Sequence, residues 1–399
     1  MTSAGIPTRI IHSARLVSGG STSPDAWVAF TGDRVSAVGS GTDWQALGTR
    51  TSDVTDAAGR LLTPGFIDIH CHGGGGFAFD DGADPQARAD AIRVALAVHH
   101  RHGTTRAVLS LVTAGQADLE LGLAAVADAA EANPLVLGAH LEGPFLDDAY
   151  RGAHDPAMLR APDAESIARL VAAARGHLRQ VTLAPELPGA PEAIRPLVDA
   201  GVAVAVGHTA ADYSTALAAF EAGASILTHA FNGMRGIHHR APGPVAAATR
   251  SPGVTLEIIN DGVHVHPEVV RLAFAGAPGR IALITDAMAA TGSGDGAYLL
   301  GSLAVTVTDG VARLSGNGAA DRGAIAGSTL TLDAALRRAV TEVGISVEEA
   351  VTALTETPAR AIGQSHNLGL LAVGYAADAV LLGDDFTVDA VFAAGRLLP

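Results

Sequence analysis

The feature that most constrains the fold is an alternation of short apolar runs with alanine-rich segments through the middle of the chain. Eight runs have the composition of buried strands: 66–72, 105–112, 135–143, 181–186, 202–209, 225–232, 254–261 and 281–288. Most are separated by segments with helical spacing, such as 84–103 and 163–177. Near-continuous apolar strands are typical of a parallel sheet that is covered on both faces. The pattern therefore predicts an α/β fold, a (β/α)8 TIM barrel.

An open doubly wound sheet is the alternative that this alternation leaves open. The common nucleotide-binding forms of that fold carry G-x-G-x-x-G or G-x-x-x-x-G-K-[ST] after a strand. Neither motif follows any of the eight runs. The polar residues at the ends of the runs, described below, favour the barrel.

Both ends of the chain have a different, β-like pattern with turn residues after each short run. We expect residues 1–62 and 366–399 to form one small β-sandwich domain built from both termini. Residues 63–365 would then form the barrel. Within it, residues 297–320 have the pattern of a β-hairpin insertion after the eighth strand.

Charge and composition exclude several classes of protein. The formal net charge of −15 provides no basic surface for nucleic acid. No run reaches the roughly 18 apolar residues of a membrane span, and the first residues lack the pattern of a secretory signal. The single cysteine, Cys71, cannot form an intrachain disulfide, which suits a reducing compartment. We therefore expect a cytoplasmic enzyme with no nucleic-acid partner and no membrane association.

Residues able to bind metals or move protons recur at the carboxyl ends of five predicted strands. They are His70, His72, Glu142, His208, His229 and Asp286. In a TIM barrel these strand ends meet at one mouth, where catalytic residues lie. Chance placement at all five ends is improbable, so the sequence predicts a metal centre there.

The residue types indicate which metal ions would bind. Imidazole and carboxylate ligands together suit zinc, iron, manganese or cobalt better than calcium or magnesium. Glu142, His208 and His229 would hold one ion and leave a position for water. His70 and His72 are two residues apart, so they face the same side of a strand and could hold a second ion. The chain contains no lysine, which excludes a carbamylated lysine as the bridge between two ions. Asp286 would then act as general base beside the activated water.

Several segments resemble the N-acetylglucosamine-6-phosphate deacetylases of the amidohydrolase superfamily. The motif HLEGPF, followed closely by GAH, is specific to that family, whereas PGFIDIHCH is shared by the wider superfamily. The matching segments span almost the whole chain: 61–76, 138–156, 205–213, 228–234, 259–265, 284–292, 324–336 and 369–382. The presence of both His70 and His72 favours two ions, since some members of the family lack this pair and use one.

The resemblance implies further site residues. His154 would polarise the acetyl carbonyl beside the metal, and Asp286 would be the catalytic acid–base. The residues implied to bind substrate are Ala153, Asn232, Gly233, Arg240, His264, Ile325, Ala326, Gly327 and Ser328. Arg240 and His264 would grip the phosphate. In this family the arginine can come from the neighbouring subunit, so the resemblance also implies a homodimer.

The implied activity is hydrolysis of the acetamide of N-acetylglucosamine 6-phosphate, a small phosphorylated amino sugar, in amino-sugar catabolism and cell-wall recycling. A deacetylase of another N-acetyl amino sugar, or a related deaminase, would share the metal ligands. A non-catalytic protein on the barrel fold is the alternative from another class, but it could lose metal ligands freely, and every expected ligand is present here.

Overall fold

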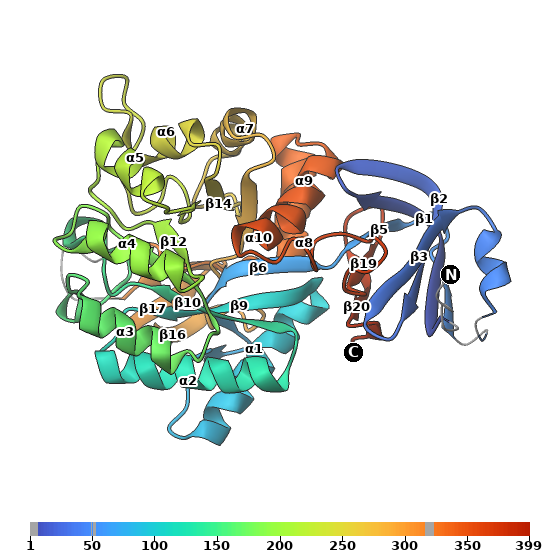
Figure 1. Cartoon of the computed structure of the whole chain (residues 1–399), viewed down its shortest axis with the longest axis horizontal. Coiled ribbons are helices and arrows are strands. Elements are labelled where there is room, and N and C mark those ends of the chain that lie inside the picture. The colour runs from blue at the N-terminus through green and yellow to red at the C-terminus, as the bar shows by residue number, and fades with distance from the viewer. Residues whose placement is uncertain (1–6, 49, 51–52, 316–322) are drawn as a thin grey trace. The chain divides into compact units, whose positions relative to one another are not determined.

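The structure is a computed structural model of the chain, and it describes residues 7–48, 50, 53–315 and 323–399. Two compact units are present (Figure 1). One comprises Met1–Ile67, His99–Arg106 and Leu332–Pro399, and the other comprises Asp68–Val98 and Ala107–Thr331. Among the described residues, none of the helices has the length and apolar character needed to cross a bilayer.

Eight parallel strands form the sheet of the barrel, in the order β15-β14-β13-β12-β11-β10-β9-β6. Their bounds are β6 Phe66–Cys71, β9 Thr104–Val112, β10 Val136–Glu142, β11 Leu178–Leu183, β12 Ala203–Val206, β13 Ile226–Leu227, β14 Thr255–Ile259 and β15 Ile281–Ile284. Each falls within or overlaps one of the eight predicted runs. The sequence-based prediction of a TIM barrel is thereby confirmed.

The last strand returns to the first through hydrogen bonds just beyond its end. The backbone N–H of Asp286 donates to the carbonyl of His70 at 2.8 Å, and that of His72 donates to the carbonyl of Ala287 at 2.8 Å. Strands such as β6, β9, β14 and β15 are buried at every position. Burial on both faces explains why the strands have continuous apolar runs rather than an alternating pattern.

Helices follow most of the barrel strands. Their bounds are α1 Pro85–Arg101, α2 Gln116–Ala132, α3 Ala164–Ala173, α4 Ala190–Asp199, α5 Tyr213–Glu221, α6 Gly243–Arg250 and α7 Pro267–Gly276. Short elements at the strand ends are β7 Gly73–Gly74, β8 Phe77–Ala78 and the 3-10 helices η3 Asp148–Tyr150 and η4 Pro156–Met158. Asp163 and Asp212 cap α3 and α5 by accepting hydrogen bonds from backbone N–H groups in the first turn.

The insertion after the eighth strand has one more strand than the predicted hairpin. It is a three-stranded antiparallel sheet of β16 Gly296–Leu300, β17 Leu303–Thr308 and β18 Val311–Leu314. The prediction of two strands over 297–320 missed the turn at Asp309 and Gly310, both of which have positive φ. Residues 316–320 of the predicted segment lie outside the described part of the chain.

Strands from both termini share a second sheet, as the sequence predicts. Its order is β21-β20-β19-β5-β1-β2-β3, and β4 pairs with β1. The bounds are β1 Arg9–Ser18, β2 Ser21–Thr31, β3 Arg34–Ser40, β4 Val54–Asp56, β5 Leu61–Pro64, β19 Ala379–Leu382, β20 Val388–Ala393 and β21 Arg396–Leu397. Antiparallel pairing of β5 with β19 joins the two ends of the chain. A 3-10 helix, η1 Asp43–Leu47, follows β3.

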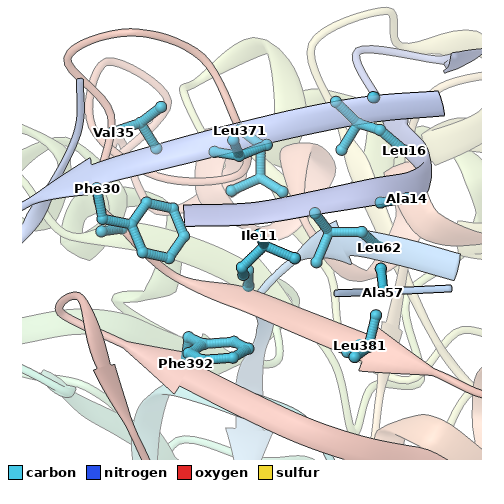
Figure 2. Packing of buried hydrophobic residues seen from close by; sticks show 14 residues of the cluster. Ile11, Ala14, Leu16, Phe30, Val35, Ala57, Leu62, Leu371, Leu381 and Phe392 are labelled. Atoms are coloured by element: carbon cyan, nitrogen blue, oxygen red, sulfur yellow. The ribbon is translucent and has the colours of Figure 1, made fainter. Parts of the chain in front are cut away.

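This sheet folds over on itself to enclose an apolar core. Phe30 on β2 and Phe392 on β20 lie four strands apart in the sheet order, about 19 Å in a flat sheet. Their ring centroids are only 6.4 Å apart, in an edge-to-face contact. Figure 2 shows the buried side chains of this core, including Ile11, Leu62 and Leu381. The arrangement is the β-sandwich that the sequence predicts.

Four helical segments precede β19 and pack within the same unit as the terminal strands. They are α8 Leu332–Arg338, the π-helix η5 Ala339–Val343, α9 Val347–Leu354 and α10 Glu356–Ala361. The sequence-based boundaries, at 62/63 and 365/366, assign these helices to the barrel domain. The predicted boundaries refer to domains that fold independently, whereas the two compact units are defined by contacts within the structure. The domain boundaries therefore stay a prediction.

A buried ion pair within this unit yields a prediction about stability. Arg106 Nε lies 2.6 Å from Asp378 Oδ2 and its Nη2 lies 3.1 Å from Oδ1, and both side chains are 8% exposed. Asp378→Ala leaves a buried guanidinium without its bidentate partner, so the free energy of unfolding should fall by about 3–5 kcal/mol. Chemical denaturation measures this loss. The control is Asp389→Ala, which removes a more exposed pair with Arg60 and should cost less than about 1 kcal/mol. Equal losses in the two variants would contradict the prediction.

Candidate metal and catalytic site

The six predicted strand-end residues meet at the carboxyl end of the barrel. His70 lies on β6, His72 follows it, and Glu142 is the last residue of β10. His208, His229 and Asp286 each lie two residues beyond the end of a strand, β12, β13 and β15 respectively. The structure therefore brings together side chains that are up to 216 residues apart in the chain.

Glu142 is at the centre of the cluster and contacts both halves of it. Its Oε1 lies 3.1 Å from His208 Nε2 and 3.0 Å from His229 Nε2, and these two nitrogens are 3.0 Å apart. Its Oε2 lies 3.1 Å from His72 Nε2. His70 Nε2 lies 3.1 Å from His72 Nε2. Asp286 Oδ1 is 3.5 Å from His70 Nε2 and 3.4 Å from His72 Nε2.

Local backbone conformation directs three of these side chains into the cluster. His208, His229 and Asp286 have φ values of 47°, 25° and 50°, in a region that residues other than glycine rarely adopt. Such strain persists where the surrounding structure fixes it and is common at functional sites. Gly233 also permits close approach, because a Cβ there would lie 2.9 Å from His208 Nδ1.

The donor atoms fit a bound cation. His208 Nδ1 donates to the carbonyl of Tyr150 at 2.9 Å, which leaves the Nε2 lone pair directed at Glu142 and His229. Two pairs of imidazole nitrogens face each other, His208 with His229 at 3.0 Å and His70 with His72 at 3.1 Å. Two lone pairs at such a distance repel each other, and a positive centre between them removes this repulsion. Groups of ligand atoms close enough to share an ion are His70, His72, Glu142 and Asp286, and Glu142, His208 and His229.

The pKa values of the histidines also indicate that the cluster favours a bound positive charge. Burial alone would lower the pKa of His72, but contacts with Asp286 and Glu142 raise it to about 9. Burial opposes charge on His70 as well, yet the same two carboxylates hold its pKa well above the usual value. A divalent cation would supply the charge that the carboxylates otherwise draw from protons.

The two predicted catalytic side chains border the cluster in different protonation states. Burial would raise the pKa of Asp286, but His70 and His72 lower it below its usual value, so its carboxylate is ionised at neutral pH. Burial lowers the pKa of His154 to about 4, so its imidazole is neutral. His154 Nδ1 faces the hydroxyl of Thr113 at 2.9 Å and the backbone N–H of Thr113 at 3.4 Å. With Nδ1 as acceptor, the hydrogen of His154 is on Nε2, which lies 3.5 Å from Glu142 Oε2.

A cavity of about 240 Å³ opens over the cluster. Most residues implied to bind substrate lie on its wall: Ala153, Asn232, Gly233, His264, Ile325 and Gly327. Two neighbours in the same loop are buried behind the wall. Ala326 is fully buried, and Ser328 donates its backbone N–H to the carbonyl of Asp286 at 2.7 Å. The roles of these residues stay predictions.

Arg240 is the predicted site residue that the structure does not bring to the cavity. It is exposed, and its Nη1 lies 2.7 Å from Nε2 of the adjacent His239. Within a single chain, the group at the cavity wall suited to an anion is His264. Burial opposes charge on His264, but its 2.6 Å contact with Asp261 raises its pKa above the usual value.

Three supporting residues were not identified from the sequence. Glu257 on β14 contacts His70 Nδ1 at 3.1 Å. Asp68 on β6 accepts a hydrogen bond from the Thr285 hydroxyl at 2.6 Å, next to Asp286. Both ring nitrogens of His140, on β10, form hydrogen bonds with hydroxyl groups, and the ring lies beneath the cluster. An ionisable residue inside an otherwise apolar strand was the signal available for all three.

Comparisons with known proteins agree with this arrangement. Residues 61–398 match the model of the Amidohydrolase family. N-acetylgalactosamine-6-phosphate deacetylase of Escherichia coli O157:H7 is 38% identical over 349 residues, which are 86% of this chain and 89% of that protein. N-acetylglucosamine-6-phosphate deacetylase of Vibrio furnissii is 37% identical over 358 residues, 88% of this chain and 86% of that protein. A solved structure of a Mycobacterium smegmatis N-acetyl-D-glucosamine-6-phosphate deacetylase mutant, in complex with N-acetyl-D-glucosamine-6-phosphate, has a TM-score of 0.89 and 41% identity over 98% of each chain.

Proposed function

Because the chain belongs to the amidohydrolase family, we propose that it hydrolyses the acetamide of N-acetylglucosamine 6-phosphate to acetate and glucosamine 6-phosphate. The observation that carries the proposal is the cavity over Glu142, His208 and His229, whose wall also holds Asp286 and His154. Relatives at 35–37% identity over 86–88% of this chain carry the name of this activity. The reaction belongs to amino-sugar catabolism and cell-wall recycling.

The cluster is suited to one or two divalent cations. When bound, a cation of this kind supplies a water of lowered pKa and positive charge for the acetyl oxygen. Glu142, His208 and His229 would hold one ion, and His70 with His72 a second. Glu142 contacts both halves of the cluster, His208 and His229 through Oε1 and His72 through Oε2, so it could serve both ions. Zinc suits this donor set, and iron, manganese and cobalt accept the same ligands.

Asp286 would move the proton that hydrolysis requires. Its ionised carboxylate lies on the cavity wall beside His70 and His72. It would accept a proton from the attacking water and then deliver it to the departing nitrogen, because an amine leaves an amide only when it is protonated.

His154 would bind the acetyl oxygen. A neutral ring donates through Nε2–H when Nδ1 accepts from Thr113, and Nε2 lies 3.5 Å from Glu142 Oε2 at the edge of the cluster. A donor fixed at this place stabilises the negative charge that develops on the oxygen during attack.

The phosphate and sugar would occupy the rest of the cavity. His264, whose pKa is raised by its contact with Asp261, provides an imidazole suited to an anion there, and Asn232 and Gly233 provide polar contacts beside His208. Ala153, Ile325, Ala326, Gly327 and Ser328 would shape the remaining wall. Arg240 would complete the phosphate site from the neighbouring subunit, so we also propose a homodimer. We further propose a cytoplasmic location, where phosphorylated sugars are formed.

The Arg240 assignment yields a prediction about specificity. An arginine on a phosphate contributes a charged, bidentate contact, so Arg240→Ala should lower kcat/KM for the phosphorylated sugar about 10- to 100-fold. The same variant should leave the slow reaction of unphosphorylated N-acetylglucosamine unchanged. The comparison of both substrates in steady-state kinetics measures the effect, with Arg195→Ala, an exposed arginine paired with Asp199 on α4, as the control. Unaltered discrimination between the two substrates in Arg240→Ala would refute the assignment.

A second candidate substrate is the 4-epimer, N-acetylgalactosamine 6-phosphate. The specific observation in its favour is the relative named for it, at 38% identity. The experiment is to incubate the purified protein with both phosphorylated sugars and with unphosphorylated N-acetylglucosamine, and to measure acetate. Release of acetate chiefly from the glucosamine derivative supports the proposal. Release chiefly from the galactosamine derivative supports the alternative, and ammonia without acetate would indicate a deaminase.

A further inference from the structure

Glu257 is a buried carboxylate beside the cluster that has no assigned role. It lies in the middle of β14, and its side chain is 0% exposed. Burying a carboxylate is costly unless an opposite charge and hydrogen bonds compensate it. Among the residues that the structure describes, the one ion-pair partner of Glu257 is His70, with no arginine in contact. The positive charge that compensates Glu257 must therefore act through His70.

Three donors surround the two oxygens of Glu257. Oε2 lies 3.1 Å from His70 Nδ1 and 3.3 Å from the backbone nitrogen of His229. Oε1 accepts from Gln180 Nε2 at 2.8 Å. An ionised carboxylate only accepts hydrogen bonds. A His70 ring that binds a cation through the Nε2 lone pair is neutral, so its one hydrogen must then be on Nδ1.

Nε2 of His70 is the atom that faces the centre of the cluster. It lies 3.1 Å from His72 Nε2 and 3.4 Å from Glu142 Oε1. The other rings lack this kind of support: within the described residues, Nδ1 of His72 and of His229 has no hydrogen-bond partner, and Nδ1 of His208 faces a neutral carbonyl. His70 is thus the ring of the cluster with a carboxylate behind it.

We propose that Glu257 is a positioning residue that orients His70 and sets its tautomer for the cation held by the His70–His72 pair. A carboxylate behind a ligating imidazole fixes the ring and makes its other nitrogen a stronger donor. The proposal rests on the cation site of the proposed function. It also accounts for the buried charge, because a cation at Nε2 offsets Glu257 across the ring.

The test is Glu257→Gln, which keeps the size of the side chain and removes its charge. Chelator-treated protein is titrated with Zn²⁺ against a competing chromophoric chelator. Wild type should bind two ions. In the variant, the affinity for one ion should fall about 10- to 100-fold, and the affinity for the other should change by less than about threefold. Glu120→Gln, a carboxylate on α2 paired with the exposed Arg169, is the matched control and should bind like wild type.

Thermal unfolding supplies a readout that a merely structural role would not produce. Without metal, Glu257→Gln should unfold at a lower temperature than wild type, because the buried pair between Glu257 and His70 is lost. With Zn²⁺, the rise in Tm should be smaller in the variant than in wild type. A metal-dependent rise in Tm as large as that of wild type would overturn the proposal.

A third measurement needs no variant of Glu257. In zinc-loaded wild type labelled with ¹⁵N-histidine, the His70 ring should carry its hydrogen on Nδ1, assigned by loss of the signal in His70→Asn. A hydrogen on Nε2 would overturn the proposal, as would binding of two ions with equal affinities in wild type and Glu257→Gln, or of a single ion in wild type. Binding of no ion by wild type would instead refute the proposed function itself.

Discussion

Asp286→Asn should retain fold and metal but lose deacetylation, with kcat falling about 10²- to 10⁴-fold. Asparagine has nearly the same shape as aspartate, so the barrel closure through the Asp286 backbone N–H and the His70 carbonyl is kept. The amide, however, can neither accept a proton from water nor return one to the leaving nitrogen. Steady-state acetate release and elemental analysis of the same sample measure the two quantities.

The Asp286 experiment separates proton transfer from metal binding. Asp286 lies at the edge of the cluster, 3.4 and 3.5 Å from the two histidines of β6, and it does not contact His208 or His229 in the described structure. The ion at Glu142, His208 and His229 should therefore stay bound in the variant. Turnover within about tenfold of wild type, with metal present, would rule out the proton role.

Glu142→Gln should abolish both metal binding and turnover. Glu142 contacts His72, His208 and His229 through its two oxygens, so it belongs to both halves of the cluster. Loss of an outer-shell partner already costs about 10- to 100-fold in metal affinity, and we expect the loss of this direct ligand to cost more than about 100-fold. Metal analysis after dialysis, followed by acetate assay, measures both effects.

The two variants together form a matched pair. Each converts a buried carboxylate to its amide at the same end of the barrel. Asp286→Asn should keep the metal and lose the chemistry, and Glu142→Gln should lose both. A Glu142→Gln protein with wild-type metal content and turnover would show that Glu142 is not a ligand.

Much of the fold was predictable because its signals are local. The barrel strands are buried on both faces, so most of their length is apolar, and the eight runs stand out without knowledge of their neighbours. The terminal strands are only partly buried, but their sandwich was predictable from short β-like runs and turn residues at both ends. The third strand of the 296–314 sheet was missed even though Asp309 and Gly310 form a dipeptide that is typical of a two-residue hairpin turn.

The ligand candidates were predictable because topology constrains them. In a barrel, residues at the carboxyl ends of strands converge, so the positions of Glu142, His208 and His229 in the sequence imply their proximity. The orientation of their side chains was not predictable. It depends on positive φ at His208 and His229 and on the carbonyl of Tyr150, which are properties of the folded backbone.

Residues that act through others were hardest to find. Glu257 and Asp68 lie inside apolar strands, and what they contact depends on which strands are neighbours across the barrel. Arg240 illustrates the opposite limit: resemblance assigns it to the phosphate, yet within one chain it is exposed and lies away from the cavity. Under the proposed homodimer, Arg240 would act from the second subunit.

The account depends most on the coupling of a cation at Glu142, His208 and His229 to amide hydrolysis. The direct measurement is acetate released from N-acetylglucosamine 6-phosphate by chelator-treated protein as Zn²⁺ is restored stepwise. We predict negligible release without metal, and release that rises with bound zinc until the site is full. Undiminished acetate release from protein shown to be free of metal would contradict the account.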